Sequence, residues 1–473
     1  MLRTFYNRTS EIKFLNKKHK EKTNQIIIIY GRRRVGKTDL IKQFIKNKDA
    51  IYFLGDKRGT EKNLQRFVDN ICKFYQLAPL KIDSFDDAFK LIVERNAKKN
   101  KKGLIVVIDE FSYLIERDPA LTSVFQLIID EILSKTDIFL ILCGSSMSMM
   151  EKGVLSYKSP LYGRRTGQIK LEPLKFRTIK KFFPKYSTKE LIETYSIIGG
   201  IPAYLILFDP EKNIFENIKH TFFVKEHIFY EEPEIILKEE LREPKVYFNI
   251  LEAMASGTTR LTDIANKAGI NAKDSSAYIN SLIELDIVEK ENPITEKKPI
   301  SKKALYFIKD NFFIFWFKFI LGNKELIERE RTIELLKRIE VELPTHVSMR
   351  FEKICAEFLW SRKDFNFTKL GRWWGVFRDT VSGERRPVEI DIVAINETIK
   401  EIIFAECKWQ SKKVGKHVAL DLLKKAEQVD WCKKNRIERY IIFSRSGFNK
   451  SCLEFCQRNG ILLYDLEDIK KTF

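Results

Sequence analysis

Two short motifs near the start of the chain have the residue types and spacing that phosphate chemistry requires. Residues 31–38 read Gly-Arg-Arg-Arg-Val-Gly-Lys-Thr, which satisfies the pattern GxxxxGK[ST] at every defined position. In such a loop the backbone N–H groups surround a phosphate, the lysine reaches the terminal phosphates and the hydroxyl binds Mg²⁺. ATP or ADP is therefore predicted to bind at Gly31, Arg32, Arg33, Arg34, Val35, Gly36, Lys37 and Thr38.

The second motif is a pair of acids at the end of a buried strand. Residues 104–108 are all aliphatic and lead directly into Asp109 and Glu110. Asp109 is expected to complete the Mg²⁺ site with Thr38, and Glu110 to orient and polarise the water that attacks the γ-phosphate. The pair therefore predicts hydrolysis of ATP in addition to binding.

Strands and helices alternate around these motifs. The apolar run 26–30 predicts a buried strand that enters the phosphate loop, and a helical pattern follows the loop directly. Further strands are expected at 51–54, 138–142 and 168–171. This order predicts a parallel α/β sheet with its ligand at the carboxyl ends of the strands.

Three more polar residues are expected near the nucleotide. Ser145 follows the strand at 138–142, where its hydroxyl could sense the γ-phosphate. Arg164 and Arg165 precede the last strand, where an arginine can reach the phosphates of a neighbouring subunit. That role predicts a homo-oligomer with a trans-acting arginine; the alternative is an ordinary surface ion pair.

The carboxyl third contains a second group of residues suited to phosphate chemistry. Residues 388–395 alternate as a half-buried strand, and residues 401–409 return as another, so a hairpin is expected. It brings together Asp391 and, fifteen residues later, Glu406-x-Lys408. The two carboxylates could bind Mg²⁺ and Lys408 could orient water or stabilise charge, which suggests cleavage of nucleic acid.

The middle of the chain gives a weaker signal. Residues 245–290 predict three helical segments spaced as in a helix-turn-helix. The candidate reading helix exposes one cation, Lys273, and one acid, Asp274, too little positive charge to neutralise many phosphates. A structural spacer and a DNA-contacting module both fit this segment.

Composition limits the classes of protein that remain. The chain has 473 residues, of which 44% are hydrophobic and 32% charged, and its formal net charge is +20. The positive balance fits DNA or RNA as a partner, although solubility explains it equally well. The longest apolar run, residues 311–321, is about half a membrane span and contains Lys318. With seven scattered cysteines and no secretory leader, we expect a cytoplasmic protein without a membrane partner.

Taken in order, the motifs of the first 240 residues resemble the archaeal ATPase family of the AAA+ superfamily, close to the STAND-type signalling ATPases. The resemblance rests on segments 31–38, 104–110, 144–146, 161–165 and 199–202. It implies that Pro202 belongs to a helical lid over the adenine. It also implies that Arg8 and Glu11 form an adenine-side motif, in which this chain has Asn7 where the family usually has glycine.

The carboxyl third resembles the PD-(D/E)XK nuclease superfamily, with Ile390 where the signature has proline. This resemblance implies that Glu352 supplies an additional carboxylate from a helix. It also implies that a residue of the helix at 418–431, either Gln428 or one of Lys424 and Lys425, assists from the far side.

The expected fold is therefore an α/β multidomain chain. It comprises a P-loop AAA+ core (1–180), a helical lid (181–240), a winged helix-turn-helix (241–310), a linker (311–344) and a restriction-endonuclease-like α/β domain (345–473). Two functions fit it: an ATPase that controls a Mg²⁺-dependent nuclease, and an ATP-driven switch or scaffold whose last domain binds without cutting.

Overall fold

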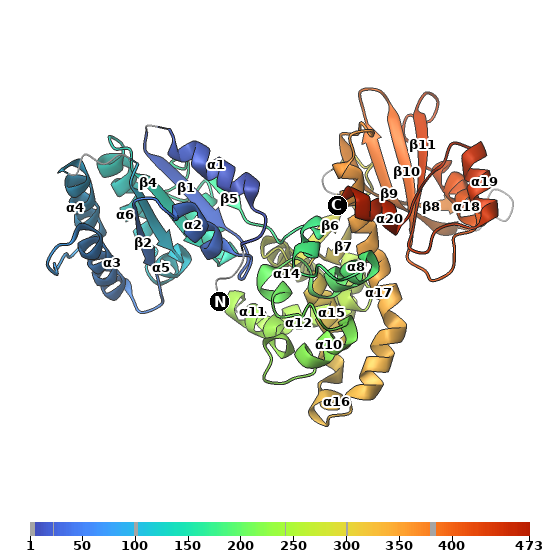
Figure 1. Ribbon diagram of the computed structural model, residues 1–473, viewed down its shortest axis with the longest axis horizontal. Coiled ribbons are helices and arrows are strands. Elements are labelled where there is room, and N and C mark those ends of the chain that lie inside the picture. Colours follow the sequence, from blue (N-terminus) through green and yellow to red (C-terminus); the bar gives the residue numbers. More distant parts are fainter. Residues whose placement is uncertain (1–4, 22, 99–102, 242, 299–300, 379–384) are drawn as a thin grey trace. The chain divides into compact units, whose positions relative to one another are not determined.

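A computed structural model describes residues 5–21, 23–98, 103–241, 243–298, 301–378 and 385–473 (Figure 1). The chain divides into two compact units. The first unit contains residues 1–174 and 201–203, and the second contains residues 175–200 and 204–473. The predicted boundary at residue 180 therefore lies a few residues inside the second unit.

The first unit is built on a five-stranded sheet in the order β2-β3-β4-β1-β5, and every pairing in it is parallel. The strands are β1 (Gln25–Tyr30), β2 (Ala50–Leu54), β3 (Ile105–Asp109), β4 (Phe139–Gly144) and β5 (Gly167–Lys170). The larger helices are α1 (Thr9–His19), α2 (Lys37–Ile45), α3 (Thr60–Tyr75), α4 (Phe85–Lys98), α5 (Phe111–Arg117) and α6 (Leu121–Leu127). The predicted parallel sheet is confirmed.

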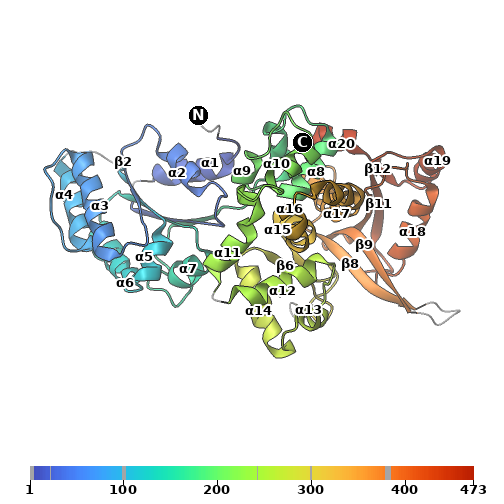
Figure 2. The ribbon, with the colours of Figure 1, turned by 90° about the horizontal axis from the view of Figure 1, so that it is seen from below.

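Burial on both faces explains the apolar strands of this sheet. All six residues of β1 are buried. Helices α1 and α2 cover one face, where Leu15, Ile41 and Phe44 pack on Ile27 and other strand residues. Figure 2 shows α5 and α6 on the opposite face. Strand β4 pairs with both β1 and β3, so the phosphate loop and the acidic pair lie two strands apart at one edge.

The second unit begins with helices and a small sheet. The helices are α8 (Thr188–Ile198), α10 (Ile214–Thr221), α11 (Glu232–Glu240), α12 (Pro244–Ala255), α13 (Leu261–Ala268) and α14 (Ala272–Glu284). Strands β6 (Val288–Glu291) and β7 (Leu305–Ile308) pair antiparallel. The turn between α13 and α14 follows Gly269, whose φ of 68° is left-handed, as at many helix ends.

Residues 311–344 differ from the linker expected there. They contain α15 (Asn311–Phe319), α16 (Lys324–Glu328) and the start of α17 (Thr332–Ser361), which passes residue 344 without a break. Six of the nine residues of α15 are buried. Phe312 lies against Tyr204 and Phe222, and the Trp316 indole N–H donates to the carbonyl of Tyr230. This segment is the core of the helical part of the second unit.

The carboxyl part holds a mixed sheet in the order β12-β11-β10-β9-β8. The strands are β8 (Lys369–Arg378), β9 (Arg385–Asn396), β10 (Glu401–Lys408), β11 (Ile437–Ser444) and β12 (Leu462–Tyr464). Strands β8, β9 and β10 are antiparallel neighbours, and β11 runs parallel to β10. Helices α18 (Lys416–Ala426) and α19 (Lys450–Arg458) cover one face, α17 lies on the other, and α20 (Leu466–Thr472) ends the chain (Figure 2).

None of the helices in the described residues is both long enough and apolar enough to cross a membrane.

Candidate functional site

The phosphate loop connects β1 to α2 with a backbone that requires glycine at its start. Gly31 has a φ of 151°, and a Cβ there would lie 2.4 Å from the carbonyl oxygen of Leu171, just beyond β5. Gly36 has a φ of 92°, in the left-handed region that favours glycine. Any side chain at residue 31 would therefore push the loop away from the sheet.

Lys37 closes the loop on itself. Its ammonium donates to the carbonyl oxygens of Gly31, at 2.8 Å, and of Arg32, at 2.9 Å. The side chain is buried, and burial lowers the pKa of Lys37, while nearby acidic groups, including Glu110 and Asp109, oppose that shift. A phosphate arriving in the loop would provide Lys37 with a charged acceptor in place of two carbonyl groups.

The expected Mg²⁺ pair is assembled in this unit. The Thr38 hydroxyl donates to Asp109 Oδ2 at 2.8 Å, which joins the first turn of α2 to the end of β3. The Tyr52 hydroxyl donates to the same oxygen at 2.7 Å. Burial and the Asp109 carboxylate raise the pKa of Tyr52, so it stays a neutral donor. A tyrosine in a strand gives no sequence signal for this role, and Tyr52 was not predicted.

Glu110 is held by the neighbouring strand. The Ser145 hydroxyl donates to Glu110 Oε2 at 2.6 Å, and the Ser145 backbone N–H donates to the same atom at 3.2 Å. Glu110 itself has a left-handed backbone, with φ of 55°, and directly precedes α5. The predicted γ-phosphate sensor thus contacts the predicted water-orienting acid directly.

The three loop arginines differ in their surroundings. Arg32 is buried, and Arg34 has a left-handed backbone with φ of 67°. The Arg33 guanidinium donates to the Tyr113 hydroxyl at 2.6 Å, which ties the loop to α5. Val35 is fully buried under α1 and α2 and anchors the loop in the core.

Arg8 contacts the loop from the amino-terminal side. Its guanidinium donates to the carbonyl oxygens of Val35, at 3.1 Å, and Glu172, at 2.7 Å, and it pairs with Glu11 at 3.3 Å. Asn7 and Arg8 both have left-handed backbones, with φ of 63° and 65°. Asparagine tolerates that conformation better than most residues, which explains how it replaces the usual glycine.

Arg164 and Arg165 make contacts within their own chain. Arg164 forms a forked ion pair with Asp130, its Nη2 lying 2.7 Å from Asp130 Oδ2. Arg165 donates to the carbonyl of Leu155 at 3.2 Å and lies over the Tyr162 ring. The alternative of a surface ion pair therefore describes Arg164.

Pro202, the expected lid residue, lies beside the phosphate loop. A Cβ built at Gly36 would be 3.9 Å from Pro202 Cγ, an ordinary van der Waals contact. Residues 201–203 are accordingly grouped with the first unit.

The carboxyl sheet brings together the second predicted group. Asp391 on β9 accepts the backbone N–H of Cys407 at 2.8 Å, so its carboxylate lies beside Glu406 at the end of β10. Glu406 is buried, and its carboxylate accepts from Lys408 at 2.6 Å and from Lys425 of α18 at 3.1 and 3.2 Å. Of the assisting residues considered, Lys425 of α18 contacts this site, and Gln428 lies just beyond the end of that helix.

Glu352 reaches the group from α17. Burial, together with the Asp391 carboxylate, raises the pKa of Glu352 well above its usual range. Burial and the Glu406 carboxylate also raise the pKa of Asp391. Arg372 of β8 lies 3.5 Å from Glu352. The three carboxylates thus form a row of interacting groups, with Arg372 at the Glu352 end and two lysines at the Glu406 end.

Across the described residues, no three His, Cys, Asp or Glu side chains converge closely enough to form a ready metal cage. A Mg²⁺ ion bound by these residues would need oxygen ligands from the substrate as well, as Mg²⁺ sites on phosphates commonly have. Thr38 with Asp109 supplies oxygen donors of that kind, and so does Asp391.

Comparison with known proteins assigns the chain to a family. Residues 5–208 match a family described as an ATPase domain predominantly from Archaea, and residues 316–419 match archaeal and bacterial proteins of unknown function. Uncharacterized protein MJECL04 of Methanocaldococcus jannaschii is 35% identical over 98% of this chain and 99% of its own length.

Two solved structures are similar at lower identity. The Walker-type ATPase PABY2304 of Pyrococcus abyssi aligns with 66% of this chain and 96% of its own at 19% identity, with a TM-score of 0.51. The ORC2 protein of Aeropyrum pernix, solved with ADPNP and ADP, aligns with 70% of this chain and 97% of its own at 12% identity, with a TM-score of 0.45. The chain belongs to the family of MJECL04 and carries the archaeal ATPase domain, with its P-loop and parallel sheet.

Proposed function

We propose that this archaeal ATPase binds ATP with Mg²⁺ and hydrolyses it at the edge of the first sheet. The observation that carries the proposal is the 2.8 Å contact between the Thr38 hydroxyl and Asp109, because it sets two oxygen ligands beside the phosphate loop. Lys37 and Glu110 lie close to this Thr38–Asp109 contact.

Each residue has a distinct task in this proposal. The loop N–H groups and Lys37 hold the β- and γ-phosphates, and Thr38 with Asp109 holds the metal. Bound Mg²⁺ would neutralise charge on the phosphate oxygens. Glu110, oriented by its hydrogen bonds from Ser145, positions the attacking water in line with the bond to be broken.

Steady-state phosphate release tests this function. The wild type should hydrolyse ATP only with a divalent metal present, and Glu110→Gln should retain nucleotide binding while losing at least about 100-fold in kcat. Binding of ATP without turnover by the wild type would reduce the proposal to a nucleotide-dependent switch.

We propose as a second function that the carboxyl sheet cleaves a phosphodiester bond of DNA or RNA. This proposal is supported by Asp391 and Glu406 lying next to each other, with Lys408 and Lys425 on the Glu406 carboxylate. Asp391 and Glu406 would hold a Mg²⁺ ion through their carboxylate oxygens, and Lys408 and Lys425 lie within reach of the same point. An amine at this place would stabilise charge on the phosphate.

The test uses single- and double-stranded DNA and RNA with Mg²⁺ or Mn²⁺, in the presence and absence of ATP. Cleavage should be lost in both Asp391→Ala and Lys408→Ala, while ATP hydrolysis continues. Binding of nucleic acid without cleavage in the wild type would favour the switch or scaffold.

We further propose that α12–α14 with β6 and β7 form a winged helix that acts as a spacer rather than as a base reader.

A further inference from the structure

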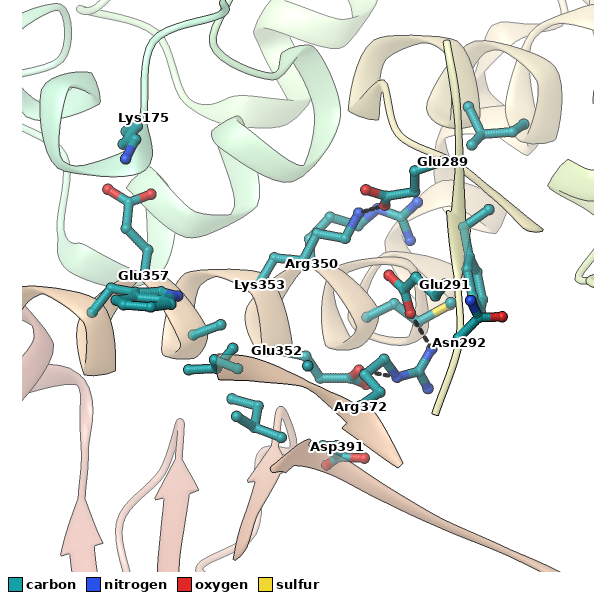
Figure 3. Close-up of a pocket in the computed structure, with 18 residues that line it drawn as sticks. Lys175, Glu289, Glu291, Asn292, Arg350, Glu352, Lys353, Glu357, Arg372 and Asp391 are labelled. Atoms are coloured by element: carbon teal, nitrogen blue, oxygen red, sulfur yellow. Dashed lines mark hydrogen bonds and ion pairs between the residues drawn. The ribbon is translucent and has the colours of Figure 1, made fainter. Parts of the chain in front are cut away.

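A cavity of about 550 Å³ adjoins the carboxylates of the carboxyl sheet. Its walls come from the small β6–β7 sheet, from α17, and from β8 and β9. Glu352 and Asp391 face it from one side and Glu289 and Glu291 from the other, as Figure 3 shows. The small sheet therefore covers the side of the site from which a substrate could reach Glu352 and Asp391.

Two carboxylates of β6 form ion pairs with two of the cations that line this cavity. Glu289 pairs with Lys353 of α17, and Glu291 lies 3.9 Å from Arg372 of β8. Glu289 and Glu291 are two residues apart on one strand, so both point to the same face of it. Burial and the neighbouring Glu289 raise the pKa of Glu291, so this carboxylate is held at a cost in solvation.

Arg372 is the centre of the contact. It also pairs with Glu352 at 3.5 Å and with Glu389 at 3.3 Å, and it lies over the Phe307 ring of β7. Its backbone carbonyl accepts the N–H of Ile294 at 2.9 Å, so the segment after β6 is bonded to β8. Farther along β8, the Trp374 indole N–H donates to the carbonyl of Lys303 at 3.0 Å.

A phosphodiester approaching Asp391 would need cations like these. Lys353 and Arg372 both line the cavity, and each forms an ion pair with a carboxylate of β6. Carboxylates and phosphates compete for the same lysine and arginine donors. The acids of β6 therefore occupy positions that the oxygen atoms of a nucleic-acid backbone would take.

We propose that Lys353 and Arg372 form a backbone-phosphate site for nucleic acid, and that Glu289 and Glu291 of the β6–β7 sheet block it as an internal competitor. The inference rests on the second proposed function, because it concerns the substrate of the same site. Nucleic acid binds there only when the small sheet moves away from β8 and α17. The contact is autoinhibitory.

The first test removes the competitor. Fluorescence anisotropy with labelled single-stranded DNA and RNA, without divalent metal, compares the full chain with the double variant Glu289→Gln/Glu291→Gln. We expect affinity to rise about tenfold, since two neutralised carboxylates no longer compete for the cations. The matched control is Glu284→Gln/Glu296→Gln, which changes the net charge equally at sites outside the cavity, and it should bind like the wild type.

The second test fixes the sheet in place. A Cβ built at Gly371 lies 3.6 Å from the Cβ of Ile294, within the range that disulfides require. The variant Ile294→Cys/Gly371→Cys should lose at least about tenfold in affinity when oxidised and recover on reduction. Each single-cysteine variant should respond to neither treatment.

The outcomes separate this inference from the function on which it rests. If the wild type binds nucleic acid and the oxidised Ile294→Cys/Gly371→Cys variant binds it equally well, the blocking role is wrong. The nucleic-acid function would then still stand. Equal affinity in the test and control double variants would also overturn it. If neither the wild type nor Glu289→Gln/Glu291→Gln binds any nucleic acid, both proposals fail. Adding Lys353→Gln/Arg372→Gln to the Glu289→Gln/Glu291→Gln variant should weaken its binding of nucleic acid. Unchanged binding would show that Lys353 and Arg372 do not form the phosphate site.

Discussion

The Ser145 hydroxyl lies 2.6 Å from Glu110 Oε2, and the Ser145 backbone N–H donates to the same oxygen. Two donors from the end of β4 therefore determine where the acid at the end of β3 points. Ser145 therefore orients Glu110.

Replacing Ser145 tests whether this orientation matters for turnover. Ser145→Ala removes the shorter hydrogen bond and leaves the backbone N–H, so we expect kcat for ATP to fall about tenfold with KM nearly unchanged. Ser146→Ala, which alters the adjacent hydroxyl, is the control and should stay near the wild-type rate. A rate that rises in Ser145→Ala would mean that the serine restrains Glu110 rather than positioning it.

Lys37 offers a direct test of the phosphate loop. Loss of its charge-assisted contact to the phosphates should weaken ATP binding by about 2 kcal/mol, or roughly 30-fold. The measurement is titration of a fluorescent ATP analogue into Lys37→Ala. Lys46→Ala removes an exposed lysine just after the same helix and should bind as the wild type does. Equal affinities in the two variants would place the nucleotide elsewhere.

The sequence predicts the phosphate loop and the acidic pair because each lies within a few consecutive residues at the end of a buried strand. Their meeting across β4 follows from parallel topology alone. The contacts of Tyr52 and of Arg372 were beyond such reasoning. Tyr52 meets Asp109 across the sheet, and Arg372 meets Glu291 from a strand more than 80 residues away in the chain. No local pattern encodes either contact.

Helix α15 had a signal that could have been used. A helix that is apolar on all sides is buried, whereas a linker between domains is exposed and polar. The run from Asn311 to Phe319 has only Lys318 as a charged residue and forms the centre of the helical core. In the carboxyl sheet, strand alternation correctly placed Asp391 near Glu406, and only the packing of α18 could distinguish Lys425 from Gln428.

Arg164 and Arg165 are predicted to differ in their effect on turnover. Arg164 is engaged with Asp130, and a pair that is partly exposed contributes at most about 1 kcal/mol. Arg164→Ala and Asp130→Ala should therefore each keep ATPase activity within about twofold. Arg165→Ala should lower activity if this arginine acts on a neighbouring subunit.

Dependence on protein concentration checks the trans role. We expect wild-type ATPase activity to rise faster than linearly with protein concentration. The activity of Arg165→Ala should rise linearly. Strict linearity in the wild type down to nanomolar protein would contradict a trans-acting arginine at either position.

His346 makes the helical core sensitive to acid. Its Nε2 lies 2.8 Å from the carbonyl oxygen of Ser196 and donates its proton to it, and the ring lies against Phe315 and Phe319. Burial, reinforced by Arg350, lowers the pKa of His346 from 6.5 to about 3. The unfolded chain therefore binds a proton that the folded chain does not bind, and stability falls as pH drops below 6.5.

One pH unit below that value should cost about 1.4 kcal/mol in the free energy of unfolding. The measurement is the thermal midpoint between pH 7.5 and 5, in wild type and in His346→Gln, which keeps a neutral N–H donor and cannot titrate. We expect the variant to have a lower midpoint at pH 7.5 and a shallower decline with acid. His417→Gln, at an exposed position of α18, should decline as the wild type does. A parallel decline in all three proteins would assign the acid sensitivity to other groups.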